Sequence, residues 1–474
     1  MNTKTVVAIA FSGSLVGCSV SLEYDKSIGE QNSQVVAAQM GLYQKHQLDS
    51  YVDNVGQKLV AHLDEPEFTF SFHIVDDTTP NAFALPGGYI YISRGLLALM
   101  NNEDELACVL AHEIIHVTER HSVQQMKRSI LPSLSQVPGN IVGSVISEDL
   151  GALINAPIAI SSGLFMASYS RGHETQSDEL GVKLAVKAGY NPYSMGLILT
   201  RLNTAVEFTT QQETQKSYFD SHPYTPERVE HVNLWAAQFT NQYAPATDDR
   251  FVRRLNGLLI GNNPDKGVFV GDDFLHPLLG FSMQFPSEWQ KVNLPNVVAA
   301  GNESQTGMIA LTRVSADYNA EQMSQQFSSY MQQHFDYKVD ISQYENEWGS
   351  DTYHAQIRDS KGGKPVYLDQ YWLDVEDATY QLMSVTSADT VVLASESAFS
   401  FKPISQQQRD AIYQRELKVV TVQKGEDVAK LLERSNSPMR NRGVEILNGL
   451  ESANDLSEGD ALKVIVKAPY TSNQ

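Results

Sequence analysis

The feature that most constrains this chain is the pentapeptide HEIIH at residues 112–116, which lies inside a largely apolar stretch. Apolar residues recur there at helical spacing, and Asn102 precedes an acidic first turn, so the stretch predicts a helix with a buried face. His112 and His116 are four residues apart and therefore lie on the same helix face. Two imidazoles placed in this way can hold one zinc ion, and Glu113 beside them can act as a general base on water. An exposed helix with two solvated histidines is the alternative that the pentapeptide alone leaves open.

A catalytic zinc site needs a third protein ligand, and residues 169–192 offer one on a second predicted helix. Gly189 and Pro192 mark the end of this helix. Glu174 and Asp178 are four residues apart and share a face. We expect Glu174 to complete the zinc shell and Asp178 to accept the free ring N–H of a ligating histidine. Taken alone, the segment also fits a solvated acidic turn at a helix N-terminus.

Several further motifs accompany these two helices. They are Arg120-His121, Tyr169-Ser170-Arg171, Gln176-Ser177-Asp178, the octapeptide NAFALPGG at residues 81–88, and His222-Pro223 with Arg228. Together they resemble the HtpX / CAAX prenyl protease family of zinc metalloendopeptidases, the gluzincins, over residues 35 to 240. The resemblance implies that His112, His116 and Glu174 bind one zinc ion and that Glu113 is the catalytic base. It also implies that His222 approaches the metal, to plug the open position or to steady the oxyanion, whereas a surface turn is the alternative for His222.

The beginning of the chain predicts export and a lipid anchor. Residues 1–18 have a basic start and an apolar core, and they end in Leu-Val-Gly-Cys, which resembles a bacterial lipobox, so Cys18 is expected to be the lipidated residue. A plain signal peptide with an incidental cysteine is the alternative. Residues 19–34 are polar and predict a flexible tether. With the family resemblance, this points to the soluble periplasmic lipoprotein branch (BepA-like), anchored at the outer membrane.

The net charge excludes some classes of partner, and the long segment between the two predicted ligand helices raises the question of a lid. The formal net charge is −21, from 35 basic and 56 acidic residues, which argues against nucleic acid and anionic lipid as partners. Residues 127–168 are rich in Ser, Gly and apolar residues. We expect them to form a buried helix or a lid over the active site rather than a membrane span. With Cys18 lipidated, no intramolecular disulfide can form, and Cys108 is expected to be buried rather than to face the metal.

The predicted fold class is α+β. A mainly helical zinc metalloprotease domain with a small sheet is expected over residues 35–260, followed by an α+β accessory domain over 265–405. Residues 415–468 read as strand, helix, helix, strand, and they resemble a LysM-like module, the kind that binds amino-sugar polymers such as peptidoglycan. Within the first domain, residues 82–85 or 89–92 are predicted to be a strand that pairs with an extended substrate, and an ordinary core hairpin is the alternative.

These observations predict a zinc-dependent metalloendopeptidase of the bacterial cell envelope. The resemblance implies that its substrates are misfolded or misassembled envelope proteins. Two alternatives stay open: a non-catalytic envelope adaptor that binds peptidoglycan and has a silent or plugged zinc site, and a metal-dependent amidase that acts on cell-wall peptides.

Overall fold

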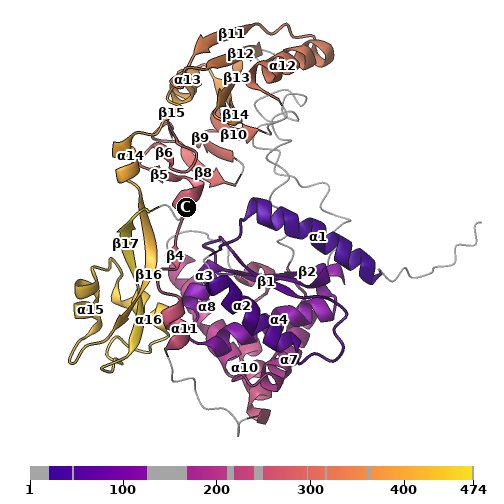
Figure 1. Cartoon of the computed structure of the whole chain (residues 1–474), viewed down its shortest axis with the longest axis vertical. Coiled ribbons are helices and arrows are strands. Elements are labelled where there is room, and N and C mark those ends of the chain that lie inside the picture. Colours follow the sequence, from indigo (N-terminus) through magenta and orange to yellow (C-terminus); the bar gives the residue numbers. More distant parts are fainter. Residues whose placement is uncertain are drawn as a thin grey trace, which may run out of the picture.

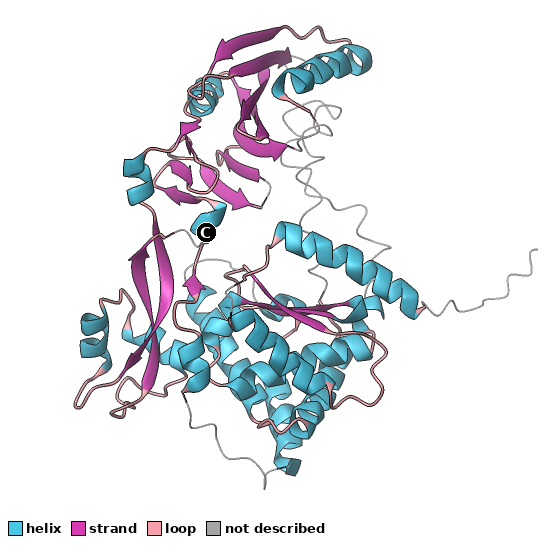
Figure 2. Cartoon of the chain, viewed as in Figure 1, coloured by secondary structure: helices cyan, strands magenta, loops and turns pink. Residues whose placement is uncertain are grey.

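The chain folds into a mainly helical lobe, a mainly β lobe and a C-terminal unit of two strands and two helices (Figure 1). The computed structural model describes residues 21–44, 47–124, 168–210, 218–239, 249–295, 297–314, 318–359 and 365–471. Cys18 and the predicted signal peptide lie outside these residues, as does almost all of the predicted lid. Helices and strands are mixed throughout (Figure 2), which confirms the predicted α+β class. None of the described helices combines the length and the apolar character that a bilayer-crossing helix requires.

The helical lobe holds most of the residues expected in the protease domain. Its elements are α1 (Leu22–Gln39), α2 (Leu48–Val60), β1 (Ser71–Val75), β2 (Ala82–Leu85), η1 (Pro86–Gly88), β3 (Tyr89–Ser93), α3 (Arg94–Leu99), α4 (Glu103–Thr118), α7 (Arg171–Lys187), α8 (Ser194–Thr210), α9 (Tyr218–Ser221), α10 (Pro226–Ala236), η4 (Ala237–Phe239) and α11 (Arg250–Arg254). The three strands form one sheet in the order β1-β3-β2, with β1 parallel and β2 antiparallel to β3. Helix α4 contacts α2, α7, α8 and β2.

Helix α4 is the centre of the core of this lobe. Every residue from Glu105 to Val117 is buried, as expected for a helix that is apolar on nearly all sides and has neighbours all around it. Its start is capped by the Asn102 side chain, which accepts a hydrogen bond from the Glu105 amide. A helix held on every side can place its polar residues accurately, because neither its axis nor its rotation is free.

The predicted tether is wrong from Leu22 onward, because residues 22–39 form helix α1. Ser21 caps the helix, and the buried carboxylate of Asp25 accepts from Arg120 Nε at 2.7 Å. Gly29 lies so close to η1 that a Cβ there would stand 1.9 Å from the Pro86 carbonyl oxygen. The polar sequence conceals this helix because the contacts that stabilise it are distant in the chain.

The β lobe contains two sheets. Its elements are η5 (Pro264–Lys266), β5 (Val268–Val270), β6 (Asp273–His276), β7 (Phe281–Gln284), β8 (Gln290–Leu294), β9 (Val297–Gly301), β10 (Gly307–Val314), α12 (Ala320–Phe335), β11 (Ile341–Glu345), β12 (Asp351–Asp359), β13 (Val366–Val375), β14 (Ala378–Ser387), α13 (Val391–Phe399), β15 (Lys402–Pro403) and α14 (Gln406–Asp410). A seven-stranded sheet has the order β11-β12-β13-β14-β10-β9-β8, and a four-stranded sheet has the order β15-β7-β6-β5. Helix α12 contacts β12 and β13, and α13 contacts β7, β10 and β14.

The C-terminal unit has the predicted strand-helix-helix-strand order. Its elements are β16 (Tyr413–Thr421), α15 (Val428–Ser435), α16 (Asn441–Asn448) and β17 (Ala461–Pro469). Strand β16 pairs with β17 and also with the short β4 (Leu259–Ile260), which follows the helical lobe in the chain. Leu417 and Leu447 belong to the same hydrophobic cluster as the core of the helical lobe. The unit is therefore packed into that lobe rather than attached by a linker alone.

Candidate metal centre

Two histidines of α4 and one glutamate of α7 meet in the interior of the helical lobe. The Nε2 atoms of His112 and His116 are 2.9 Å apart. Glu174 Oε1 lies 3.3 Å from His116 Nε2, and Glu174 Oε2 lies 3.7 Å from His112 Nε2. All three side chains are buried. The structure thus brings together the two segments that the sequence places about sixty residues apart.

Helix α7 reaches this position because it packs very closely against α4. Gly181 faces the α4 backbone, and a Cβ at this position would lie 3.1 Å from the amide nitrogen of His112. A larger residue would hold the two helix axes farther apart. Ser170 caps the start of α7 by accepting from the His173 amide. Glu174 follows one turn later and is directed to the histidines.

A third histidine, His222, completes the cluster. It follows the short helix α9, and its Nδ1 lies 3.4 Å from His112 Nε2 and 3.1 Å from Glu174 Oε1. One ligand atom from each of the four residues His112, His116, Glu174 and His222 lies within 4.8 Å of the others. Four ligands about 2.0–2.1 Å from one ion at tetrahedral angles would be about 3.4 Å apart. The observed spacing, and a donor set of imidazoles with one carboxylate, fit a zinc ion.

The protonation states of His116 and Glu174 suit metal binding. Burial lowers the pKa of His116 well below its usual range, so the imidazole is neutral, as a metal ligand must be. Burial opposes ionisation of Glu174, but His222 and His116 outweigh it and hold the pKa of this carboxyl well below its usual range. The carboxylate is therefore ionised and available as a ligand.

Glu113 lies beside the cluster in a different environment. It is fully buried, and neither of its carboxylate oxygens receives a hydrogen bond in the part of the chain that the structure describes. Burial raises the pKa of Glu113, and His222 and His112 lower it only in part. The nearest ring nitrogen across the site is His222 Nε2, 3.5 Å from Glu113 Oε1. A desolvated carboxylate next to a group of candidate metal ligands is suited to take up and release a proton.

Each of the two α4 histidines lies beside a different polar partner. Asp178 Oδ1 lies 2.9 Å from His112 Nδ1, and His121 Nδ1 lies 3.1 Å from His116 Nδ1. Such partners set the orientation and tautomer of a metal-binding imidazole. Sequence reasoning assigned this kind of role to Asp178 but no defined role to His121. The ring of His121 also contacts Gln176, with His121 Nε2 3.2 Å from Gln176 Oε1.

Arg228 links the acidic residues behind the cluster. Its Nη1 lies 2.6 Å from Glu174 Oε2, and its Nε and Nη2 donate to the two oxygens of Asp178 at 2.8 and 2.9 Å. Burial opposes ionisation of Asp178, but Arg228 and His112 outweigh it and lower the pKa of this carboxyl. The sequence marked Arg228 only as part of a motif, because no local spacing connects α10 with α7.

Two tyrosines line the cluster. Tyr169 belongs to a motif that the sequence singled out without a role, whereas no motif marked Tyr218. The ring of Tyr169 stacks on His116 with centroids 3.8 Å apart, and its hydroxyl lies 2.8 Å from Ser122 Oγ. The ring of Tyr218 stacks on His222 at 4.4 Å, and its buried hydroxyl has no hydrogen-bond partner among the described residues. Both rings restrict the positions of the imidazoles that they cover.

Two other residues that the sequence singled out lie away from the candidate metal centre. Cys108 is buried, and its thiol donates to the Asn191 carbonyl at 3.5 Å, so it does not face the cluster. Arg171 is exposed at the start of α7.

Comparisons with known proteins agree with this centre. Residues 46–236 match the model of Peptidase family M48. The beta-barrel assembly-enhancing protease of Yersinia pestis is 28% identical over 193 residues, 40% of this chain and 40% of that protein. The protein of the same name from Escherichia coli (strain K12) is 23% identical over 254 residues, 53% of this chain and 52% of that protein. The mitochondrial metalloendopeptidase OMA1 of Schizosaccharomyces pombe is 27% identical over 219 residues, which are 46% of this chain and 62% of that protein.

The chain spans about half the length of the curated relatives it matches. The matched region contains the whole metal cluster, and the comparisons support the M48 metalloprotease family for it.

Proposed function

Because residues 46–236 match the model of Peptidase family M48, we propose that this chain is a zinc-dependent metalloendopeptidase of the bacterial cell envelope. The observation that carries the proposal is the meeting of His112, His116 and Glu174, with the buried carboxylate of Glu113 beside them. The proposed substrates are misfolded or misassembled envelope proteins. The bacterial relatives are beta-barrel assembly-enhancing proteases, which supports an envelope setting.

Each residue of the site has a distinct role in the proposed reaction. Zinc held by His112, His116 and Glu174 would supply the Lewis acid that polarises the scissile carbonyl and activates the attacking water. Glu113 takes a proton from that water and delivers it to the leaving amine. Its raised pKa makes it a better proton acceptor than an exposed carboxylate. Asp178 and His121 keep the two imidazoles of α4 in place while the charge in the site changes.

Strand β2 is the proposed docking edge for the substrate backbone. Strand β3 is paired on both sides, so of the two strands proposed from the sequence only β2 lies at an edge. The Ala84 carbonyl is turned away from β3, because it accepts from Ser122 Oγ at 3.1 Å. An extended peptide could add to this edge by main-chain hydrogen bonds. Replacing Ala84 with Pro removes the outward amide, so KM for a peptide substrate should rise, and unchanged kinetics would rule out this edge.

With His222, the centre has four candidate protein ligands instead of three. Catalytic zinc sites keep a coordination position open, whereas structural sites are closed by four ligands. We infer that the arrangement described is a resting form and that His222 must withdraw before water and substrate enter. The second candidate function follows from the same observation: a non-catalytic envelope protein whose closed zinc site is structural.

The central experiment is replacement of Glu113 with Gln. This change keeps the shape of the side chain but removes the proton acceptor, so zinc content should stay at one per chain while cleavage of casein is lost. Glu179→Gln is the matched control. Glu179 lies on the surface of α7, and in the described part of the chain it pairs only with Lys183. Metal analysis and a casein assay on the three proteins give the answer. A Glu113→Gln protein that still cleaves casein at the wild-type rate refutes the mechanism.

The location of the protein is a separate proposal that rests on residues 1–18. We expect Cys18 to be acylated and the protein to lie in the periplasm, anchored at the outer membrane. Palmitate labelling and membrane fractionation of the wild type beside Cys18→Ser test this, since the variant should lose both the label and the membrane association. The LysM-like module predicts binding to peptidoglycan, which a pull-down of the full chain on purified cell wall tests.

A further inference from the structure

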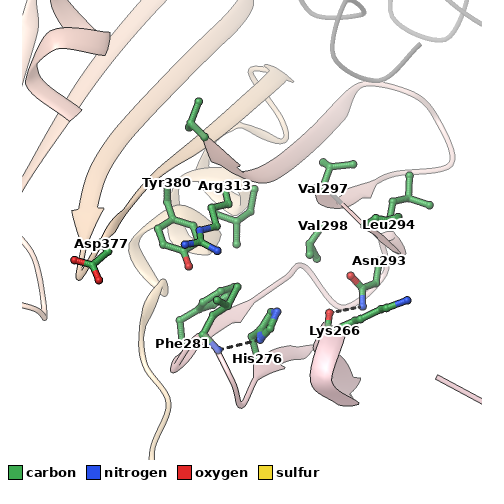
Figure 3. Close-up of a pocket in the computed structure, with 14 residues that line it drawn as sticks. Lys266, His276, Phe281, Asn293, Leu294, Val297, Val298, Arg313, Asp377 and Tyr380 are labelled. Carbon is green, nitrogen blue, oxygen red and sulfur yellow. Dashed lines mark hydrogen bonds between the residues drawn. The ribbon is translucent and has the colours of Figure 1, made fainter. Parts of the chain in front are cut away.

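A cavity of about 490 Å³ lies in the β lobe, far in the sequence from the metal centre. Its size falls in the range of about 300–1,000 Å³ that is usual for ligand sites. Apolar side chains make up most of its wall, including Leu279, Phe281, Val298 and Leu311. Figure 3 shows the polar side chains placed around this apolar lining.

Arg313 and Tyr380 form one part of the wall. They are direct neighbours in the register of β10 and β14, so their side chains lie on the same face of the sheet. Arg313 is exposed and has neither an ion pair nor a hydrogen bond in the described part of the chain. Tyr380 is only 3% exposed, yet its hydroxyl has no hydrogen-bond partner among the described residues. Both groups are therefore available to a ligand.

His276 supplies a third donor from the four-stranded sheet. Its Nδ1 accepts a hydrogen bond from the Leu279 amide at 3.2 Å. Burial, with the charge of Arg313, lowers the pKa of His276 to about 4, so the ring is neutral near pH 7. A neutral imidazole whose Nδ1 accepts has its proton on Nε2. Figure 3 shows the ring directed into the cavity, so this N–H is presented to its contents.

The three donors select an anionic group. A guanidinium, a phenol and an imidazole N–H together complement a carboxylate. The ammonium group of Lys266, also on the wall, is already paired with Asp76 Oδ2 at 2.9 Å. Asp377 lies on the other side of Tyr380 from His276 (Figure 3). Of the two cations on the wall, Arg313 is therefore the one without an anionic partner among the described residues.

An edge strand leads to the same cavity. Strand β8 is the last strand of the seven-stranded sheet, and its residues Asn293 and Leu294 line the cavity. Val292 and Leu294 are apolar, yet they are 47% and 44% exposed. An unpaired strand edge offers main-chain donors and acceptors to an extended chain. A fatty acid would match the carboxylate site and the apolar lining but would leave this edge unused.

We propose that the cavity binds the free carboxyl terminus of an extended polypeptide. The terminal carboxylate is held by Arg313, Tyr380 and His276, an apolar last side chain fills the cavity, and the preceding residues pair with β8. The β lobe then selects polypeptide ends, independently of the chemistry at the metal centre.

Fluorescence anisotropy on the full chain tests this. The probe is a fluorescein-labelled hexapeptide of alternating threonine and valine that ends in phenylalanine, prepared as the free acid and as the carboxyl-terminal amide. The protein is the Glu113→Gln chain, in which the probe should not be cut, so failure of binding leaves the proposed peptidase activity untouched. We expect the amide to bind about tenfold more weakly than the acid, because it lacks the charge that strengthens the hydrogen bonds.

Variants of the wall separate a specific site from general attraction. Arg313→Gln should weaken binding of the acid about tenfold, to the level of the amide, and Tyr380→Phe should weaken it severalfold. Arg358→Gln is the matched control, because Arg358 is an exposed arginine of the same sheet on β12. It should leave the affinity unchanged. Thermal unfolding of each variant verifies that the lobe is folded.

Three results would overturn the proposal. Equal affinity for acid and amide would remove the carboxylate from the recognition. An effect of Arg358→Gln as large as that of Arg313→Gln would show non-specific charge attraction. Arg313-dependent binding of oleate, together with no binding of the peptide acid, would make the occupant a fatty acid instead of a polypeptide.

Discussion

At the scale of single residues, the metal centre is a set of buried charges that neutralise one another. Glu174 and Asp178 are each only 1% exposed, and both share the guanidinium of Arg228. Buried carboxylates are costly unless they are paired, and removal of one partner leaves the others without compensation. Arg228 therefore supports a ligand and the partner of a ligand at the same time, although no metal contact is expected for it.

Replacing Arg228 with Gln should lower the free energy of unfolding by about 3–5 kcal/mol, because two buried carboxylates lose their cation. Arg253→Gln is the control, since the pair that Arg253 forms with Asp249 is exposed to solvent and should contribute little to the free energy of unfolding. Urea unfolding of the metal-free proteins measures both values. Equal, small losses for the two variants would mean that Arg228 does not stabilise the cluster.

Replacing His222 with Ala separates the two functions proposed for the metal centre. In a peptidase whose resting form is closed by His222, the variant should keep zinc through the other three ligands and cleave casein faster than the wild type. In a protein with a structural zinc site, the variant should lose zinc affinity and gain no activity. Zinc content and casein turnover, measured on the same samples, distinguish the two outcomes. The surface change Arg253→Gln serves again as the reference for folding.

At the scale of elements, the site depends on how closely α7 approaches α4. The approach is set by Gly181, whose missing side chain lets the two backbones touch near His112. Glu174 lies two turns earlier on the same helix, so any shift of α7 moves this carboxylate relative to both histidines. The distance between α4 and α7 therefore determines the geometry of the candidate metal ligands.

Gly181→Ala should reduce zinc affinity by about tenfold or more, the size of effect expected when the support of a ligand is disturbed. The added methyl group would meet the His112 backbone at about 3.1 Å, so α7 must move away by a few tenths of an ångström. Gly172→Ala makes the same chemical change in the same helix, where the nearest heavy atom is 3.9 Å away. Competition with a zinc chelator measures both affinities, and equal values for the two variants would exclude this role of Gly181.

At the scale of the whole molecule, the C-terminal unit is joined to the helix that precedes α4. Lys463 of β17 is completely buried, and its Nζ donates to the carbonyls of Ala98 and Met100 at 2.6 and 2.7 Å. Burial and nearby Arg201 lower the pKa of this lysine well below its usual range. The carbonyls lie at the end of α3, where a helix has acceptors without internal partners. Through Lys463, the C-terminal unit therefore supplies hydrogen-bond donors to two backbone carbonyls of the helical lobe.

Lys463→Met should lower the free energy of unfolding by about 1–3 kcal/mol, because two buried carbonyls lose their donor. Lys418→Met on the adjacent strand β16 is the control, since Lys418 is exposed and surface changes usually stay within about 0.5 kcal/mol. Urea unfolding followed by circular dichroism gives the values. We expect the helical lobe and the C-terminal unit to unfold in one transition, because Leu417 and Leu447 belong to their common core. A separate early transition of the unit would contradict this coupling.

The sequence alone determined the parts of this protein that depend on local geometry. The spacing of His112 and His116, and of Glu174 and Asp178, sets which side chains share a helix face, and helical periodicity is a property of neighbouring residues. The strand, helix, helix, strand order of the C-terminal unit followed from the same kind of pattern. Only the tertiary structure decided that Arg228, His121 and Tyr218 surround the cluster, that residues 22–39 are a helix, and that the C-terminal unit enters the core of the helical lobe. Those features depend on contacts between segments far apart in the chain, and such contacts are set by the packing of the whole molecule.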